Sequence, residues 1–199
     1  MSSDLLGPSR IIVVRHGETD WNAVSRVQGQ QDIPLNDRGR EQAVSVGQII
    51  REAYPETIGF DYVASPLSRT RETMSLMRGA MGLAPDDYRV DPRLMELHFG
   101  TWQGFAIEEV RVTDPEGVAA RDRDKWGFVP PGGESYAVLS DRIAGWLSEI
   151  VQPSVVVTHG GVARVLLGLL AGVSKDVLPN VDIRQGRALL FEGGIAQWI

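Results

Sequence analysis

The sequence contains no cysteine, which excludes disulfide bonds and thiolate metal sites. Its apolar runs are short, and none approaches the ~20 residues of a membrane-spanning helix. Residues 1–8 lack the basic region and the apolar core of a signal peptide. These absences favour a cytoplasmic protein that binds no membrane.

The sequence also has fewer basic than acidic residues. The 20 lysines and arginines are outnumbered by 26 acidic residues, so the formal net charge is −6. A general nucleic-acid-binding protein normally presents a basic face, and this charge balance argues against such a partner. Any anion site must therefore be built locally from arginine side chains and backbone N–H groups.

The length of 199 residues and the hydrophobic content of 43% fit a single globular domain over residues 1–199. Short apolar runs alternate with amphipathic segments. They predict strands at 11–14, 60–64, 88–90 and 154–158, and helices at 37–53, 107–112, 134–150 and 160–172, with a further helix from Ser65-Pro66. Two runs between 188 and 199, joined by Gly193-Gly194, are typical of an antiparallel hairpin. This order predicts a three-layer α/β/α sandwich with a mostly parallel central sheet.

Local signals refine three of these segments. Asn36 is expected to cap the 37–53 helix. Ser65-Pro66 combines a capping serine with a proline at the first helical position. Residues 17–35 have no clear period and are expected to form a functional loop. The helix after Ser65 carries a methionine stripe that is typical of core packing rather than of a cofactor site: Met74, Met77 and Met81.

Residues that can carry chemistry gather where predicted strands end. Arg15 and His16 follow the first strand, and His159 follows the strand at 154–158. Arg69 falls in the first turn of the helix after the second strand. Open parallel sheets place ligands outside the carboxyl ends of their strands, so these side chains are expected to converge. Arginine matches phosphate oxygens in pairs, and a helix N-terminus at Gly160-Gly161 offers N–H groups. The set predicts a phosphoryl site that needs no metal.

Each residue also has a structural interpretation. A lone histidine at a strand end is more often solvated or hydrogen-bonded than nucleophilic, and His159 also fits a cap for the following helix. Arg69 and Arg71 share a polar helix face, and we expect only one of them to serve the site. His98 is expected to be structural or to line the pocket wall. The aromatic residues either line an outer pocket or, more commonly, pack within the fold: Trp102, Phe105, Trp126 and Phe128.

Glu96 follows Leu94-Met95 in an apolar context, which is unusual for a carboxylate. Burial there would disfavour the charged form of the side chain, as a general acid requires. The alternative is an ion pair with Arg93 or another arginine.

The chain resembles the histidine phosphatase superfamily, in the branch of cofactor-dependent phosphoglycerate mutase and its small phosphatase relatives. The matching motifs keep the family's order from residue 10 to about residue 170, and this combination is specific. They are Arg15-His16-Gly17-Glu18-Thr19, Asn22, Arg26, Gln28-Gly29, Asp32-Ile33-Pro34-Leu35, Gly39, Ser65-Pro66-Leu67-Ser68-Arg69, Glu96, Phe99-Gly100-Thr101-Trp102-Gln103-Gly104, Pro131-Gly132-Gly133-Glu134-Ser135 and Thr158-His159-Gly160-Gly161.

The resemblance implies a phosphoglycerate mutase-like fold and catalysis without a cofactor. His16 would be the nucleophile that forms a phosphohistidine. Arg15, Arg69 and His159 would form the phosphate pocket, and Glu96 would protonate the leaving oxygen and then activate water. Four further residues match positions that contact the phosphate: Asn22, Gln28 and, more weakly, Thr19 and Gly160.

Within this family the sequence favours a phosphatase of small phosphomonoesters over a phosphoglycerate mutase. Where the mutases carry Glu-Arg-His-Tyr-Gly, this chain has Glu96-Leu97-His98-Phe99-Gly100, so Leu97 replaces the arginine. The segment from 105 to 130 is short, and Gly160 stands where the mutases have asparagine. His98 matches the mutases and keeps that alternative open.

Two other function classes fit the sequence less well. A metallohydrolase using His16, His98 and His159 lacks a specific spacing such as His-Glu-x-x-His. A non-catalytic binding module would be expected if a principal catalytic residue were missing, and all five are present. The sequence leaves open which small phosphorylated metabolite is the substrate and whether the chain forms a homodimer.

Overall fold

The computed structural model describes residues 10–199. The prediction that no signal peptide is present falls on residues 1–8 and lies outside them. The six strands form one sheet in the order β3-β2-β4-β1-β5-β6. They are β1 (Arg10–Arg15), β2 (Asp61–Ala64), β3 (Arg89–Val90), β4 (Ser154–Thr158), β5 (Ala188–Glu192) and β6 (Ile195–Trp198). The first four are mutually parallel, and β5 and β6 are antiparallel to their neighbours. The predicted, mostly parallel sheet and the Gly193-Gly194 hairpin are therefore confirmed.

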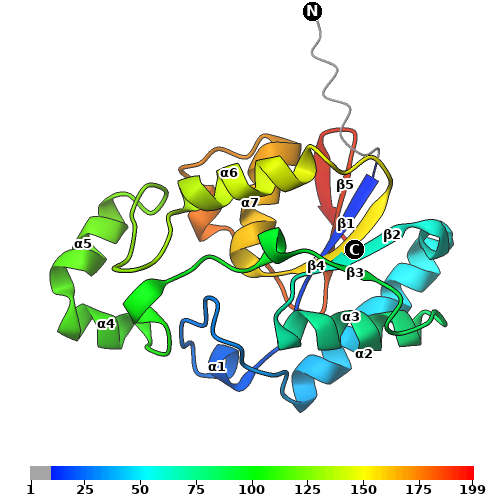
Figure 1. Cartoon of the computed structure of the whole chain (residues 1–199), viewed down its shortest axis with the longest axis horizontal. Helices are drawn as coiled ribbons and strands as arrows, with labels where there is room; N and C mark the ends of the chain where they lie inside the picture. The colour runs from blue at the N-terminus through cyan, green and yellow to red at the C-terminus, as the bar shows by residue number, and fades with distance from the viewer. Residues whose placement is uncertain (1–9) are drawn as a thin grey trace, which may run out of the picture.

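Four helices cover the two faces of this sheet (Figure 1). Helices α2 (Asp37–Ala53) and α3 (Ser68–Ala80) pack on one face, and α6 (Tyr136–Leu147) and α7 (Gly160–Ala171) pack on the other. Because side chains alternate along a strand, Ile12 and Val14 contact the first layer, whereas Ile11 and Val13 contact the second. The result is the predicted three-layer α/β/α sandwich.

A smaller unit stands beside the sandwich (Figure 1, left). It contains α4 (Ile107–Thr113) and α5 (Pro115–Arg123) and has its own small core of Trp102, Val110 and Val118. We call residues 99–128 the α4–α5 cap. The remaining helical segments are short: α1 (Asp20–Ala23), η1 (Pro55–Gly59), η2 (Pro92–Leu94), η3 (Gly100–Trp102) and η4 (Leu178–Asn180).

The structure confirms several local predictions. Helix α2 spans the predicted residues, and the Asn36 side chain accepts a hydrogen bond from the Gly39 N–H at 2.9 Å. The methionine stripe of α3 is buried against the sheet, as a core stripe should be.

Other predictions were wrong in detail. Helix α3 begins at Ser68 rather than at Ser65-Pro66. Helix α6 covers only Tyr136–Leu147 of the predicted 134–150, and Ser135 caps its start. The expected loop over 17–35 contains the single turn α1. Helix α5 was not predicted, because only Val118 of its residues is buried and the chain shows little amphipathic pattern there.

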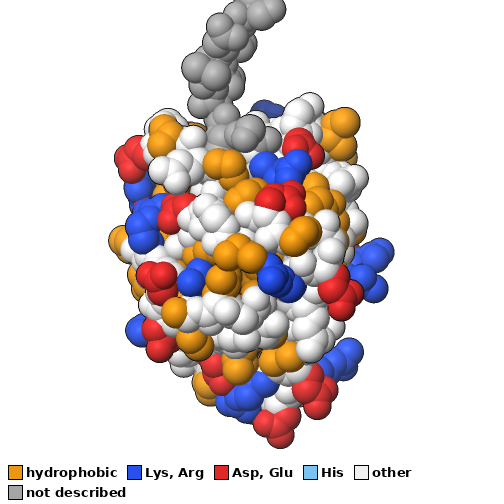
Figure 2. Space-filling model, turned by 90° about the vertical axis from the view of Figure 1, so that its right-hand side faces the viewer, with side chains coloured by type: hydrophobic (Ala, Val, Ile, Leu, Met, Phe, Trp, Pro, Cys, Tyr) orange, Lys and Arg blue, Asp and Glu red, His pale blue; other side chains and the backbone are white. Residues whose placement is uncertain are grey.

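Over residues 10–199, no helix is long and apolar enough to cross a membrane. On the face shown in Figure 2, basic and acidic side chains are interspersed, without an extended patch of either sign.

Candidate active site

The parallel topology brings the predicted residues to one edge of the sheet. Strand β4 pairs with both β1 and β2, so the carboxyl ends of all three strands are adjacent. Arg15 and His16 leave β1, His159 leaves β4, and Arg69 lies in the first turn of α3 after β2. The rings of His16 and His159 meet edge to face with their centroids 5.2 Å apart.

His16 is buried and held in one tautomer. Its Nδ1 lies 2.7 Å from the Gly17 carbonyl oxygen, and because a carbonyl only accepts, Nδ1 carries the proton. The Nε2 atom keeps its lone pair and accepts a hydrogen bond from Arg69 Nε at 3.2 Å. Burial, together with the charges of Arg69 and Arg15, holds the pKa of His16 well below its usual range. A neutral imidazole with an unprotonated Nε2 is the form that a nucleophile requires.

His159 is fully buried beside it. Its Nε2 lies 2.8 Å from Ser65 Oγ, and its buried Nδ1 has no hydrogen-bond partner among residues 10–199. Burial is the main cause that lowers the pKa of His159 well below its usual range, and the nearby Arg69 charge adds to it. Ser65 therefore orients a site histidine instead of capping α3.

Two guanidinium groups supply positive charge, that of the buried Arg69 and that of the half-buried Arg15. Arg69 donates to the carbonyl oxygens of Gly29 and Gln31, both at 2.7 Å, which fixes it to the loop after β1. Burial lowers the pKa of Arg69 to about 10, so the group stays charged at neutral pH. Arg15 donates to the Ile183 carbonyl at 2.8 Å, and its buried Nε has no partner within the described part of the chain. Arg71, by contrast, is exposed. Of the two candidates on α3, the structure brings only Arg69 to the histidines.

Glu96 lies in surroundings that differ from the apolar ones expected. The side chain is half-buried, and both oxygens accept hydrogen bonds from the Gly161 N–H, at 3.0 and 3.1 Å. Its Oε1 also accepts from the Leu97 N–H at 2.8 Å. The N-terminus of α7 thus binds a carboxylate of the chain itself. Gly161 suits this contact, because a Cβ atom there would stand 2.4 Å from Glu96 Oε1 and would displace the carboxylate.

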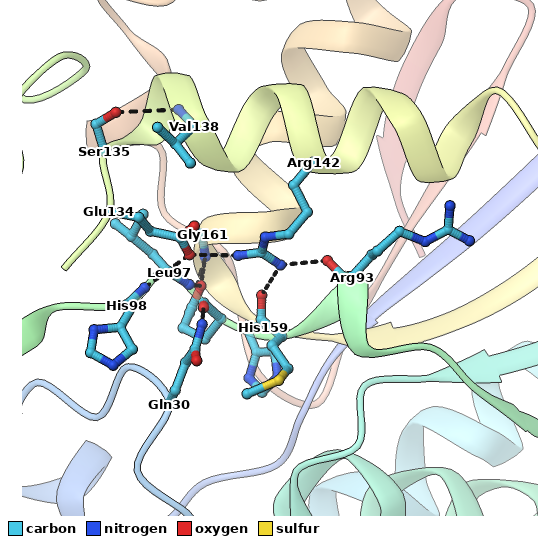
Figure 3. Close-up of polar contacts among 12 residues, drawn as sticks. Gln30, Arg93, Leu97, His98, Glu134, Ser135, Val138, Arg142, His159 and Gly161 are labelled. Carbon is cyan, nitrogen blue, oxygen red and sulfur yellow. Dashed lines mark hydrogen bonds and ion pairs between the residues drawn. The ribbon is translucent and has the colours of Figure 1, made fainter.

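The alternative prediction, an ion pair between Glu96 and Arg93, was wrong. Arg93 instead pairs with Asp91 and Glu149, at 2.8 Å in each case. Figure 3 shows Arg93 directed away from the cluster that contains Gly161 and Leu97.

The loop after β1, with α1, lies below the sheet in Figure 1. Gln28 is buried, and its Oε1 has no partner among residues 10–199. The side-chain oxygen of Asn22 accepts hydrogen bonds from the backbone N–H and the hydroxyl of Thr19. In return, Thr19 Oγ1 accepts the backbone N–H of Asn22, so the two residues cap α1 reciprocally. The Thr19 hydroxyl is therefore committed to the cap. Gly160 lies beside Arg15, and a Cβ there would stand 3.7 Å from Arg15 Nε.

Three residues of this region were missed by the sequence analysis as parts of the site. Ser65 contacts His159, as described above. Thr73 Oγ1 accepts the Gly17 N–H at 3.0 Å, and Gln185 donates both to the His16 carbonyl and to the Asn22 amide oxygen. Ser65 lies within a motif that the chain shares with the family, so the sequence could have indicated its role in the site. Nothing in the sequence around Thr73 or Gln185 indicates such a role.

The remaining candidates lie in the α4–α5 cap or directly before it. His98 Nδ1 accepts the Gly100 N–H at 2.9 Å, as expected for a structural histidine. Trp102 stacks on Phe128, Trp126 stacks on Tyr136, and Phe105 is exposed. Over residues 10–199 there is no group of three or more histidine, aspartate or glutamate side chains that could hold a metal ion. The paired histidines and arginines of the site can bind a phosphoryl group between cations and present a neutral imidazole to it.

The sequence signature of histidine phosphatase superfamily branch 1 matches residues 11–193. The chain belongs to the histidine phosphatase superfamily. It is 36% identical over 183 residues to glucosyl-3-phosphoglycerate phosphatase of Mycolicibacterium vanbaalenii, covering 85% of this chain and 77% of that one. It is also 36% identical over 183 residues to metal-independent phosphoserine phosphatase of Arabidopsis thaliana, covering 88% and 74%.

A mutase-like relative is equally similar. Phosphoglycerate mutase-like protein 4 of Arabidopsis thaliana is 38% identical over 191 residues, covering 93% of this chain and 81% of that one. Among solved structures, mycobacterial glucosyl-3-phosphoglycerate phosphatase in complex with VO3 superposes with a TM-score of 0.78 at 29% identity, covering 96% of both chains. The phosphoglycerate mutase-like fold expected from the motifs is thus confirmed.

Proposed function

We propose that this protein is a metal-independent phosphatase that hydrolyses small phosphomonoesters through a phosphohistidine on His16. The observation that carries the proposal is the His16 Nε2 atom, unprotonated and 3.2 Å from the guanidinium Nε of Arg69. Relatives named as phosphatases of phosphorylated metabolites support the reaction class. The cysteine-free composition supports a cytoplasmic location.

The reaction has two displacements. The Nε2 lone pair of His16 attacks phosphorus, the ester P–O bond breaks, and Glu96 gives a proton to the leaving alkoxide. Water then attacks the phosphohistidine, Glu96 takes its proton, the P–N bond breaks, and inorganic phosphate leaves. Arg15, Arg69 and His159 hold the phosphoryl oxygens, with Asn22, Gln28 and the Gly160 N–H as further contacts. Such positioned charge is the main source of acceleration in phosphoryl transfer.

Replacing Glu96 by glutamine should slow esters with poor leaving groups, such as alkyl phosphates, by ~10²–10⁴-fold. Aryl phosphates need little protonation of the leaving oxygen and should lose much less. Steady-state phosphate release from one alkyl and one aryl ester measures this difference. An equal loss on both esters would remove Glu96 from the role of proton donor.

The alternative function is that of a cofactor-dependent phosphoglycerate mutase. Leu97, which replaces the mutases' arginine, is buried in the main core, so no cation stands at that position. This favours a phosphatase, because a mutase must hold its phosphorylated product while the phosphohistidine persists.

Incubation with 3-phosphoglycerate and a trace of 2,3-bisphosphoglycerate separates the two functions. We expect free phosphate to accumulate faster than 2-phosphoglycerate, with both products quantified in the same sample. Isomerisation that far outruns phosphate release would overturn the phosphatase assignment.

A further inference from the structure

A narrow crevice separates the sandwich from the α4–α5 cap. Leu97 and Tyr136 line it on the sandwich side, and Trp102 and Phe128 line it on the cap side. Its two charged lining residues, Arg121 and Lys125, are both cations, although the chain as a whole carries a net charge of −6. Lys125 donates to the Asn180 side chain, and Arg121 lies 3.3 Å from Asp122, which is exposed. The crevice thus combines apolar walls with a local positive charge.

The crevice adjoins the phosphoryl site. Leu97 follows Glu96 directly, and the Tyr136 hydroxyl accepts a hydrogen bond from Arg164 Nη1 at 3.4 Å. The same Arg164 Nη1 lies 3.3 Å from the position of a Cβ on Gly160. Tyr136 therefore stands between the catalytic edge of the sheet and the two cations of the cap.

We propose that this crevice binds a carboxylate on the alcohol part of the substrate, so the preferred substrates are phosphomonoesters of hydroxy acids. This inference rests on the proposed phosphatase function. A guanidinium and an ammonium beside apolar walls attract an anion more strongly than they would in open water.

Matched pairs of esters test this inference. The first pair is 3-phosphoglycerate and glycerol 3-phosphate, which differ by a carboxylate in place of CH₂OH; the second is 4-carboxyphenyl phosphate and phenyl phosphate. In at least one pair, kcat/KM should favour the carboxylated ester by about tenfold or more, as expected for a hydrogen-bonded charge. The ratio should fall to near one in the double variant Arg121→Ala/Lys125→Ala. It should survive in Arg123→Ala, which removes an exposed cation from the same helix.

The outcomes separate the two hypotheses. A carboxylate preference that is absent from both pairs, or that survives the double variant, would overturn the crevice assignment while leaving the phosphatase intact. Failure of the wild-type protein to hydrolyse any of the four esters would overturn the proposed function itself.

Glu96 lies on an irregular segment whose backbone is held by side chains rather than by strand pairing. Arg142 reaches down from α6 and donates to the Arg93 carbonyl and, at 2.8 Å, to the Met95 carbonyl (Figure 3). Its other nitrogen pairs with Glu134 Oε1 at 2.5 Å, and this oxygen also accepts the His98 N–H at 3.0 Å. The pair therefore ties the backbone on both sides of Glu96.

From these contacts we infer that the Arg142–Glu134 pair is a positioning element for Glu96, given the proposed role of Glu96 as proton donor. The two side chains are only 21% and 15% exposed, so water cannot readily replace the contacts. Gln30 adds a third tie by donating to the Glu96 carbonyl at 3.0 Å. Proton transfer needs the donor within hydrogen-bond reach of the leaving oxygen, and small misplacements are costly.

Variants at both positions test the positioning role. Arg142→Met and Glu134→Ala should each slow alkyl phosphates about tenfold or more and aryl phosphates much less, the pattern expected for a misplaced acid. Glu134→Gln keeps an acceptor oxygen and should restore most of the activity. In a Glu96→Gln background, Arg142→Met should cause no further selective loss on alkyl phosphates. Arg93→Met, which breaks the ion pairs with Asp91 and Glu149, serves as the control.

Equal losses on both classes of ester, or an undiminished selective loss in the Glu96→Gln background, would overturn the inference. If Arg142→Met does not fold, the comparison of Ala with Gln at position 134 still decides between the outcomes.

Discussion

Replacing His16 by alanine should abolish phosphate release from every ester, by at least about 10³-fold, while the protein stays folded. The substitution removes the Nε2 lone pair that faces Arg69, whereas Nε2 of the neighbouring His159 lies 2.8 Å from Ser65 Oγ. Steady-state phosphate release gives the loss, and circular dichroism reports the fold. Acid quenching during turnover should trap an acid-labile phosphoenzyme in the wild type and none in the variant.

His98→Ala provides the matched control, since the His98 side chain accepts the Gly100 N–H and the backbone N–H that donates to Glu134 is kept in the variant. Its activity should stay within a few-fold of the wild type. The wild-type activity should also persist in EDTA. Complete loss in EDTA that a divalent metal restores would contradict a mechanism that depends on His16 alone as the nucleophile.

The convergence of the site was predictable because it follows from topology. An apolar run such as residues 11–14 predicts a buried strand, and parallel strands bring their carboxyl ends to one edge. His16, His159 and Arg69 each follow such a strand closely, so their positions depend on little else. The 37–53 helix was likewise predictable, because its cap and apolar stripe are both local signals.

The environment of Glu96 was not predictable from its neighbours in sequence. Its apolar flanking residues indicated a dry pocket, yet the carboxylate accepts the N–H of Gly161, which is 65 residues away. Ser65 is a second residue whose local sequence pattern disagrees with its tertiary contacts. Its local pattern indicated a helix cap, but the hydrogen bond to His159, 94 residues away, places it in the site. Tertiary contacts decided both cases, and a single sequence carries no record of them.

Removing the Arg69 guanidinium should be the next most damaging change for alkyl and aryl esters alike. Arg69→Ala is expected to lower kcat/KM by about 10²–10³-fold, the usual loss when one buried donor to the developing charge is deleted. Arg71→Ala, two residues along the same helix, should change it less than about threefold, because the Arg71 side chain is exposed.

The burial of Arg69 requires a check on the fold. Its side chain is 1% exposed and donates to the Gly29 and Gln31 carbonyls, so its removal also leaves two loop acceptors without their donor. Arg69→Lys keeps the positive charge but not the planar fork, and it should recover part of the stability and little of the rate. Thermal unfolding and kcat/KM measured on all three variants separate the two effects. Comparable rate losses from Arg71→Ala and Arg69→Ala would show that the general positive charge of α3, and not the position of the Arg69 guanidinium, supports the reaction.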